Sequence, residues 1–180
     1  MRLTKTVGIF GLGLIGMALA DRLLSAGHRV NGFDPDGERG GLLAAKGGAA
    51  ADTAALWECD ILLSAVFNTD QLGQIISDAP DGTGKVLVTM STCDPDEVAV
   101  LEAKARAKSI TLVEAPISGT SKQVQEGTAL LLLAGDPVGL DVFEDIADAI
   151  SPQRERVGGV GDGNRPKLAI NCILGLERAA

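Results

Sequence analysis

The chain has 180 residues, of which 46% are apolar and only 3% aromatic, and its formal charge is −8. This length and apolar content suit one domain with a sizeable core, or one domain and part of a second. The negative charge would repel a phosphate backbone, and few aromatic rings are available to stack on bases, so we expect no nucleic-acid partner. Three cysteines and the single His28 lack the spacing of metal ligands, so we expect no metal site.

The N-terminal stretch MRLTKTVGIFGLGLIGMALA has a basic start and an apolar run, which is also typical of a signal peptide. We reject that interpretation because Asp21 and Arg22 end the run and its glycines follow an ordered pattern. No apolar run approaches the roughly 18–20 residues of a membrane span. We therefore expect a soluble, cytoplasmic protein with free thiols and no membrane partner.

Short apolar runs alternate with segments of helical periodicity, a pattern that indicates βαβ units around a mainly parallel sheet. Asp70 and Asp94 are predicted helix caps, and Pro95 follows the second at the first helical position. The predicted strands are 6–10, 29–34, 60–66, 85–90, 109–115, 128–135 and a short one in 153–159. The predicted helices are 14–26, a weak one at 37–47, 53–58, one after Asp70, one after Asp94 and 141–150.

The stretch GLGLIG gives the glycine spacing GxGxxG. Alone this signal is weak, and a tight turn without a ligand is the alternative. Here a predicted strand precedes it, an amphipathic helix follows it, and Asp34 ends the second strand 18 residues beyond Gly16, which is the context of a dinucleotide-binding motif. We therefore predict a Rossmann-type, doubly wound α/β domain. Its predicted cofactor loop consists of Gly11, Leu12, Gly13, Leu14, Ile15 and Gly16.

The acidic residue at the end of the second strand bears on the choice of cofactor. The carboxylate of Asp34 suits a ribose with a free 2′-hydroxyl and repels a 2′-phosphate, so it favours NAD over NADP. Asp34 is alternatively a turn residue before Pro35, and Arg39 lies close enough in sequence to accommodate a phosphate. We expect NAD as the cofactor, with NADP as the alternative.

Three later stretches follow in order: STCDP (Ser91–Pro95), EAPISGT (Glu114–Thr120) and GDGNRPKLAIN (Gly161–Asn171). Together with the glycine loop they resemble the β-hydroxyacid dehydrogenase family, which includes 3-hydroxyisobutyrate, tartronate semialdehyde and 6-phosphogluconate dehydrogenases. The resemblance spans essentially the whole chain. It implies an oxidoreductase that transfers a hydride between NAD(P) and a small 3-hydroxy acid.

The resemblance also implies catalytic residues. Lys167 matches the family's general acid/base, and Asn171 matches the residue that orients the substrate. Hydride removal from an alcohol needs a base for the hydroxyl proton, and a lysine can serve if desolvation lowers its pKa. A spacing of four places both side chains on one helix face. On their own, both residues could equally be exposed helix residues.

Further site residues follow from the same resemblance. Ser118 and Gly119 match the pair that binds the substrate carboxylate, with Thr120 beside them in the substrate-binding loop. The chain departs from the family there, because Thr120 replaces a glycine and Glu114 replaces the common aspartate in a loop expected to face the substrate. The expected cofactor contacts beyond the glycine loop and Asp34 are Val66, Phe67 and Thr92.

Family members continue into an all-helical domain, and their lysine stands on the helix that joins the two domains. We therefore expect residues 1–160 to form the dinucleotide-binding domain, residues 161–180 to begin the interdomain helix, and the all-helical domain to be absent. Leu168, Cys172, Ile173 and Leu176 would form an exposed apolar face, which suggests a homo-oligomer. The alternatives are a non-catalytic dinucleotide-binding module and an imine reductase-like enzyme, although imine reductases typically lack this lysine.

Overall fold

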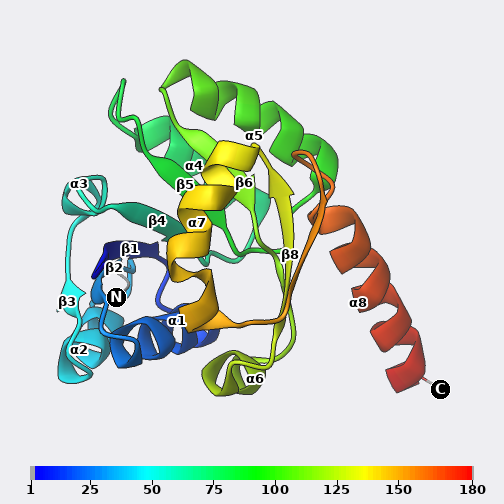
Figure 1. The fold of residues 1–180 in the computed structure, drawn as a ribbon, viewed down its shortest axis with the longest axis horizontal. Helices are drawn as coiled ribbons and strands as arrows, with labels where there is room; N and C mark the ends of the chain where they lie inside the picture. Colours follow the sequence, from blue (N-terminus) through cyan, green and yellow to red (C-terminus); the bar gives the residue numbers. More distant parts are fainter. Residues whose placement is uncertain (1–2, 180) are drawn as a thin grey trace.

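The computed structural model describes residues 3–179, with side chains to residue 177. It contains a nine-stranded sheet covered by helices on both faces (Figure 1). The strands are β1 (Thr6–Phe10), β2 (Arg29–Phe33), β3 (Ala49–Ala50), β4 (Ile61–Ser64), β5 (Val86–Thr89), β6 (Thr111–Glu114), β7 (Ile117–Ser118), β8 (Leu130–Gly135) and β9 (Arg154–Gly158). The helices are α1 (Leu14–Ser25), α2 (Gly37–Ala45), α3 (Thr53–Leu56), α4 (Thr69–Asp78), α5 (Pro95–Ala107), α6 (Ser121–Glu126), α7 (Pro137–Ile150) and α8 (Asn164–Ala179).

The sheet reverses its winding direction beside β1. From β1 the chain adds β2 and then β3 on one side, and it returns to add β4, β5 and β6 on the other, all in parallel. Such a reversal opens a crevice at the carboxyl ends of the strands. Beyond β6 the sheet becomes mixed, because β8 pairs antiparallel with both β6 and β7 and parallel with β9. The prediction of a doubly wound, mainly parallel α/β sheet is confirmed.

Two apolar cores lie on opposite faces of the sheet. One joins α1, α2, α6 and α7 to the sheet, and the fully buried Phe143 and Leu19 belong to it. The other joins α3, α4 and α5 to the opposite face around Trp57, Leu72 and Val98. The central strands are therefore buried on both faces, which is why they are continuous apolar runs in the sequence.

Most helices begin at a side chain that accepts a backbone hydrogen bond. Asp94 caps α5 with Pro95 behind it, as predicted, and its side chain accepts from the next two backbone N–H groups. The prediction that Asp70 caps α4 is wrong, because Asn68 accepts from Gln71 N and the helix begins at Thr69. Asp70 lies instead in the first turn, where a negative charge is favourable beside the helix dipole.

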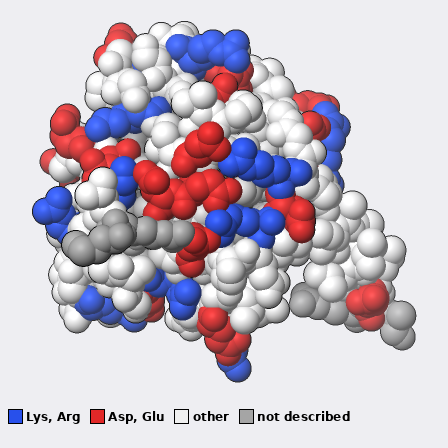
Figure 2. All heavy atoms as spheres, in the orientation of Figure 1, with Lys and Arg blue, Asp and Glu red and all other residues white. Residues whose placement is uncertain are grey.

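The surface over α7 carries both signs of charge. Figure 2 shows acidic and basic side chains side by side on this face. Arg154 of β9 pairs with Glu144 and Asp148 of α7, and Arg156 pairs with Asp141. These half-exposed pairs contribute little each to stability.

Helix α8 extends away from the rest of the molecule (Figure 1). Only its first turns contact the sheet, at β7 and β8. Leu168, Ile173 and Leu176 are 41%, 58% and 66% exposed, and Cys172 is exposed beside them. The apolar residues expected on this helix therefore lie on its surface.

Candidate functional site

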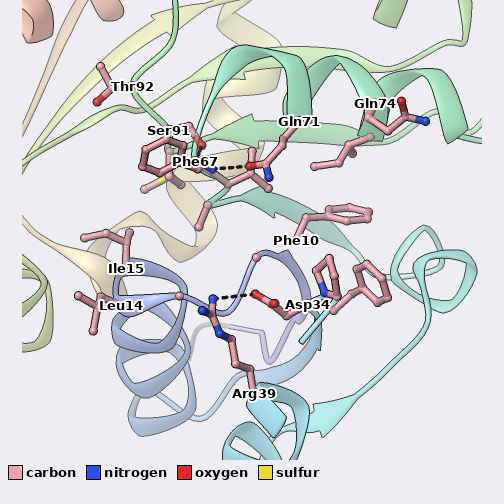
Figure 3. A pocket seen from close by; sticks show the side chains of 18 of the residues that line it. Phe10, Leu14, Ile15, Asp34, Arg39, Phe67, Gln71, Gln74, Ser91 and Thr92 are labelled. Atoms are coloured by element: carbon pink, nitrogen blue, oxygen red, sulfur yellow. Dashed lines mark hydrogen bonds and ion pairs between the residues drawn. The ribbon is translucent and has the colours of Figure 1, made fainter. Parts of the chain in front are cut away.

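A cavity of about 850 Å³ lies at the carboxyl ends of the strands, where the winding direction reverses. Figure 3 shows its two walls. One wall comes from the start of α1 and the end of β2, and the other from α4 and the loops that follow β4 and β5. Residues of β7 and α8 complete the lining. The topology thus forms one cavity from segments spread along almost the whole chain.

The glycine loop forms the floor of the cavity. Gly11 has φ +90°, and a Cβ there would lie 2.8 Å from the carbonyl oxygen of Ala65 in the neighbouring strand's loop. A Cβ at Gly16 would overlap the carbonyl oxygen of Gly11. A Cβ at Gly13 would meet only the Arg39 side chain, at 3.5 Å. Two glycines therefore permit the tight packing of turn, helix and sheet, and the third leaves the backbone open to the cavity.

The start of α1 has no side-chain cap, unlike the starts of α2 to α7. Asp36, Asp52, Asn68, Asp94, Thr120 and Asp136 each cap their helix with a side chain. At α1 the N-cap is Gly13, which has no side-chain hydrogen bond to offer, and the next two residues, Leu14 and Ile15, line the cavity. The first N–H groups of a helix need an acceptor and carry its positive dipole end. This open helix start fits the pyrophosphate of a dinucleotide.

Asp34 lies at the end of β2 and is bound from two sides. Its carboxylate accepts a hydrogen bond from Leu12 N at 2.8 Å and pairs with Arg39 at 3.3 Å, and its side chain is only 9% exposed. Figure 3 shows the pair between Arg39 and Asp34, and Arg39 also pairs with Asp36. Asp34 therefore holds the glycine loop in place, while Arg39 lies between two carboxylates at the rim of the cavity.

The opposite wall is held by hydrogen bonds between loops. Ser91 donates through its hydroxyl to the carbonyl oxygen of Val66 at 2.7 Å, which ties the loop after β5 to the loop after β4. Phe67 N donates to the side chain of Gln71 at 2.8 Å. The ring of Phe67 is 90% exposed, and Leu14 of the other wall is 80% exposed (Figure 3). Both line the cavity, so its rim is apolar on both sides.

Lys167 reaches the same cavity from the first turn of α8. It is only 8% exposed. Burial lowers the pKa of its amine from the ordinary value, because the charged form loses solvation. A lowered pKa brings the neutral, proton-accepting form of the amine closer to physiological pH, so the residue is suited to acid/base chemistry.

The structure brings most of the predicted site residues together. Gly119 lines the cavity, and Ser118 precedes it, half-buried, at the end of β7. Thr120 does not line it, because its hydroxyl accepts from Gln123 N in a capping box at the start of α6. Asn171 is exposed one turn beyond Lys167. The predicted residues that line the cavity are Gly11, Gly13, Leu14, Ile15, Asp34, Val66, Phe67, Thr92, Gly119 and Lys167, while Leu12 and Gly16 lie buried behind the loop.

One face of α4 also lines the cavity and was not predicted. Gln71 is followed by residues three, four and seven positions later, namely Gln74, Ile75 and Asp78, which places all four on one face of the helix. Gln74 donates to Asp78 at 2.9 Å. Their helical spacing was visible in the sequence, but nothing there indicated that this polar face lies opposite Asp34. The other lining residues outside the prediction are Phe10, Phe33, Pro35, Arg39, Thr53, Trp57, Ala65, Met90, Ser91 and Ile117.

A parallel sheet with a cavity at its winding reversal, a glycine turn and an open helix start define a Rossmann-type dinucleotide-binding domain. A family model described as the NAD-binding domain of 6-phosphogluconate dehydrogenase matches residues 6–159. The chain belongs to this family, which confirms the predicted resemblance and the nicotinamide dinucleotide as cofactor.

Individual relatives agree with this assignment. The chain is 30% identical, over 95% of its length, to the cytokine-like nuclear factor N-PAC of Xenopus tropicalis. Over 99% of the chain, it is 26% identical to the L-threonate dehydrogenase of Cupriavidus necator. It covers 33% and 63% of these two proteins. The solved 3-hydroxyisobutyrate dehydrogenase of Salmonella typhimurium superposes on 97% of the chain with a TM-score of 0.88 and 26% identity, and 64% of that structure is covered.

Two further features of the described residues bear on other classes of site. Between residues 3 and 179 no helix combines the length and the apolar character that crossing a bilayer requires. Within the same range, no three His, Cys, Asp or Glu side chains are grouped so that they could hold a metal ion.

Proposed function

We propose that the protein containing this chain transfers a hydride between NAD and a small 3-hydroxy acid, and that this chain provides the cofactor-binding half. The observation that carries the proposal is the buried Lys167 in the wall of the cavity whose floor is the glycine turn. A dinucleotide held with its phosphates at the start of α1 would occupy this cavity, whose lining also includes Lys167.

The chain's own groups account for the proton transfer. When bound, the nicotinamide supplies the hydride acceptor. Lys167, whose pKa is lowered by burial, takes the hydroxyl proton of the substrate in oxidation when its amine is neutral, and the protonated amine returns a proton to the carbonyl in reduction. The amine belongs to a side chain that is only 8% exposed, in a cavity whose lining also includes the buried apolar residues Met90 and Ile117.

Recognition of the acid group is assigned to the turn after β7. Gly119 lines the cavity beside Lys167, and Ser118 offers a hydroxyl next to it. A hydroxyl together with a backbone N–H can bind a small carboxylate. Thr120 is a weaker candidate for this role because its hydroxyl is engaged in capping α6. Asn171 is the residue assigned to orient the substrate, but it too is a weaker candidate, because it is exposed and lies outside the cavity lining.

NAD is preferred over NADP in this proposal. The carboxylate of Asp34 lies at the end of β2, where the adenine-side ribose of a dinucleotide binds. Arg39, the cation closest to it in the chain's cavity lining, is already paired with Asp34 and Asp36 and so is neutralised toward a 2′-phosphate.

The test is a titration of the chain with NADH, followed by nicotinamide absorbance with a panel of 3-hydroxy acids. We expect the chain to bind the dinucleotide with weak or absent turnover, and a longer protein that contains it to reduce NAD with at least one of the acids. In that longer protein, Lys167→Ala should abolish reduction and leave binding intact. Reduction that persists undiminished in Lys167→Ala would remove the lysine from the mechanism. Turnover of cyclic imines with reduced cofactor, independent of Lys167, would favour an imine reductase.

A second candidate is a dinucleotide-binding module without catalysis. It is favoured by the exposure of Asn171, which does not line the cavity although Lys167 does. Binding of NADH without turnover of any acid, in this chain and in any longer protein that contains it, would support this candidate over the dehydrogenase.

We also infer the division of the chain into a dinucleotide-binding domain, residues 1–160, and the beginning of an interdomain helix, residues 161–180. The family match to residues 6–159 and the projection of α8 support this division. A homo-oligomeric assembly and a cytoplasmic location stay predictions. The exposed apolar side chains of α8 support the first, which sedimentation would test.

A further inference from the structure

A row of buried polar side chains crosses the sheet beneath the cavity. Ser64, Thr89 and Glu114 end β4, β5 and β6, lie in register with one another, and are all fully buried. A buried carboxylate is costly unless it is hydrogen-bonded. Glu114 faces away from the substrate loop in which the sequence placed it. It points instead toward the segment that leads into α8.

Glu114 gathers the start of α8 around its carboxylate. Its oxygens accept hydrogen bonds from Gly161 N, from Asn164 N at 3.2 Å and from the side-chain amide of Asn164 at 2.6 Å. Burial raises the pKa of this carboxyl while these donors lower it, and burial is the larger effect. The carboxyl therefore binds both the loop before α8 and its first residue.

Asn164 extends this contact to the other wall of the cavity. Its side-chain oxygen accepts from Cys93 N at 2.8 Å, while its side-chain nitrogen donates to Glu114. Both ends of the amide are thus used, and only this orientation satisfies an N–H donor on one side and a carboxylate on the other. Cys93 follows Thr92, which lines the cavity, and Lys167 lies one turn after Asn164. The buried amide therefore connects the loop after β5 with the helix that carries the lysine.

The glycines of the GDGN stretch permit this arrangement. Gly161 has φ +93°, and a Cβ there would lie 3.1 Å from the carbonyl oxygen of Pro95. A Cβ at Gly163 would lie 3.0 Å from the Cβ of Glu114. The chain passes so close to the carboxylate and to the start of α5 that side chains at these two positions would displace it.

We propose that Glu114 and Asn164 are positioning residues, which lock the loop after β5 to the first turn of α8 and so hold the amine of Lys167 in the cavity. They touch neither the cavity nor a reacting atom, since neither lines the pocket. Their importance for hydride transfer rests on the proposed function. Their effect on the place of Lys167 does not.

The test follows the side-chain NMR signal of Lys167 as a function of pH, assigned by its loss in Lys167→Arg. In the unaltered chain the amine titrates below the ordinary lysine value. In Asn164→Ala and Glu114→Gln the titration moves up toward that value because the released helix lets water reach the amine. The first-turn amides of α8 exchange their hydrogens about tenfold faster, as expected for the loss of a hydrogen bond to a charged group.

Two further variants separate positioning from general destabilisation. Ser151→Ala removes a different fully buried polar group, a hydroxyl that donates to Gly127 O and lies outside the cavity lining. We expect the Lys167 titration to stay unchanged in this variant. Glu114→Asp keeps a carboxylate acceptor and retains a lowered titration. If Glu114→Gln does not fold, Asn164→Ala still gives the answer, because the carboxylate keeps its backbone donors in that variant.

The inference is overturned if the Lys167 titration is the same in Asn164→Ala and Glu114→Gln as in the unaltered chain, or if Ser151→Ala moves it equally. A longer protein that contains the unaltered chain and oxidises no hydroxy acid would instead remove the proposed function. The NMR titration would remain readable in that case, so the two failures are distinguishable.

Discussion

At the scale of single residues, Lys167 gives the proposed reaction a defined dependence on pH. Burial lowers its pKa, so the neutral amine is the form present above that lowered value. Oxidation of the hydroxy acid should therefore accelerate as pH rises through it, and reduction of the keto acid should accelerate as pH falls through it. Lys167→Met should lower kcat by about 10²–10⁴-fold in both directions and remove the dependence.

The measurement is a steady-state pH profile of the active protein in both directions, with NADH affinity determined in parallel. The affinity should be unchanged in Lys167→Met, because the glycine turn and the start of α1 are untouched. Profiles that rise with pH in both directions would contradict the assignment of the proton to this amine.

Asp34 gives a second prediction at this scale. Its replacement by Ala removes the carboxylate that favours the free ribose and releases Arg39 from one of its two pairs. The ratio of NADPH to NADH affinity should therefore rise by about tenfold or more, equivalent to about 1.4 kcal/mol. Fluorescence titration with both reduced cofactors measures the ratio. Asp36→Ala is the matched control, since it frees Arg39 from its other partner and leaves the Asp34 carboxylate in place. An unchanged ratio in Asp34→Ala would show that this carboxylate does not set the preference.

At the scale of elements, replacement of Thr120 distinguishes a structural role of its hydroxyl from a substrate-binding role. Its hydroxyl caps α6, and its backbone N–H donates to the side chain of Gln123, which closes a capping box. Thr120→Ala should lower the free energy of unfolding by about 1 kcal/mol, while Thr120→Ser should cost much less because it keeps the hydroxyl. Urea denaturation measures both. If Thr120→Ala raises the KM for the acid without a loss of stability, the hydroxyl binds substrate.

The elements that the sequence predicts are those with a period or a long apolar run. Strands β1, β4 and β5 are buried on both faces and stand out as continuous apolar segments. Strands β3 and β7 have two residues each, too few for any period, and both were missed. Helix α6 was also missed, although Thr120 and Gln123 already had the spacing of a capping box.

The site was predictable where neighbours in sequence are neighbours in space. The glycine loop needs only its own strand and helix, so its residues could be placed from spacing alone. The role of Glu114 could not, because its partners come from residues 161–164 and are brought there by the complete sheet. The same holds for the polar face of α4, which enters the site only because β4 lies beside β1.

At the scale of the whole molecule, dinucleotide binding should raise the free energy of unfolding of the chain. The cavity is lined by segments from both sides of the winding reversal, so its ligand binds the folded chain and has no site in the unfolded one. At a concentration of about 100 Kd, NADH should raise the free energy of unfolding by about 2.7 kcal/mol. Denaturation with and without NADH measures this. A gain that is absent at such a concentration would contradict binding across both walls.

The apolar rim of the cavity has a practical consequence. The side chains of Phe67 and Leu14 are almost fully exposed, so the protein without its cofactor presents two apolar surfaces to solvent at the mouth of the same cavity. A fluorophore such as ANS, whose emission increases in apolar surroundings, should bind there with increased fluorescence, and the dinucleotide should displace it. The loss of ANS fluorescence would then report the binding of any ligand in the cavity, which gives a simple optical assay.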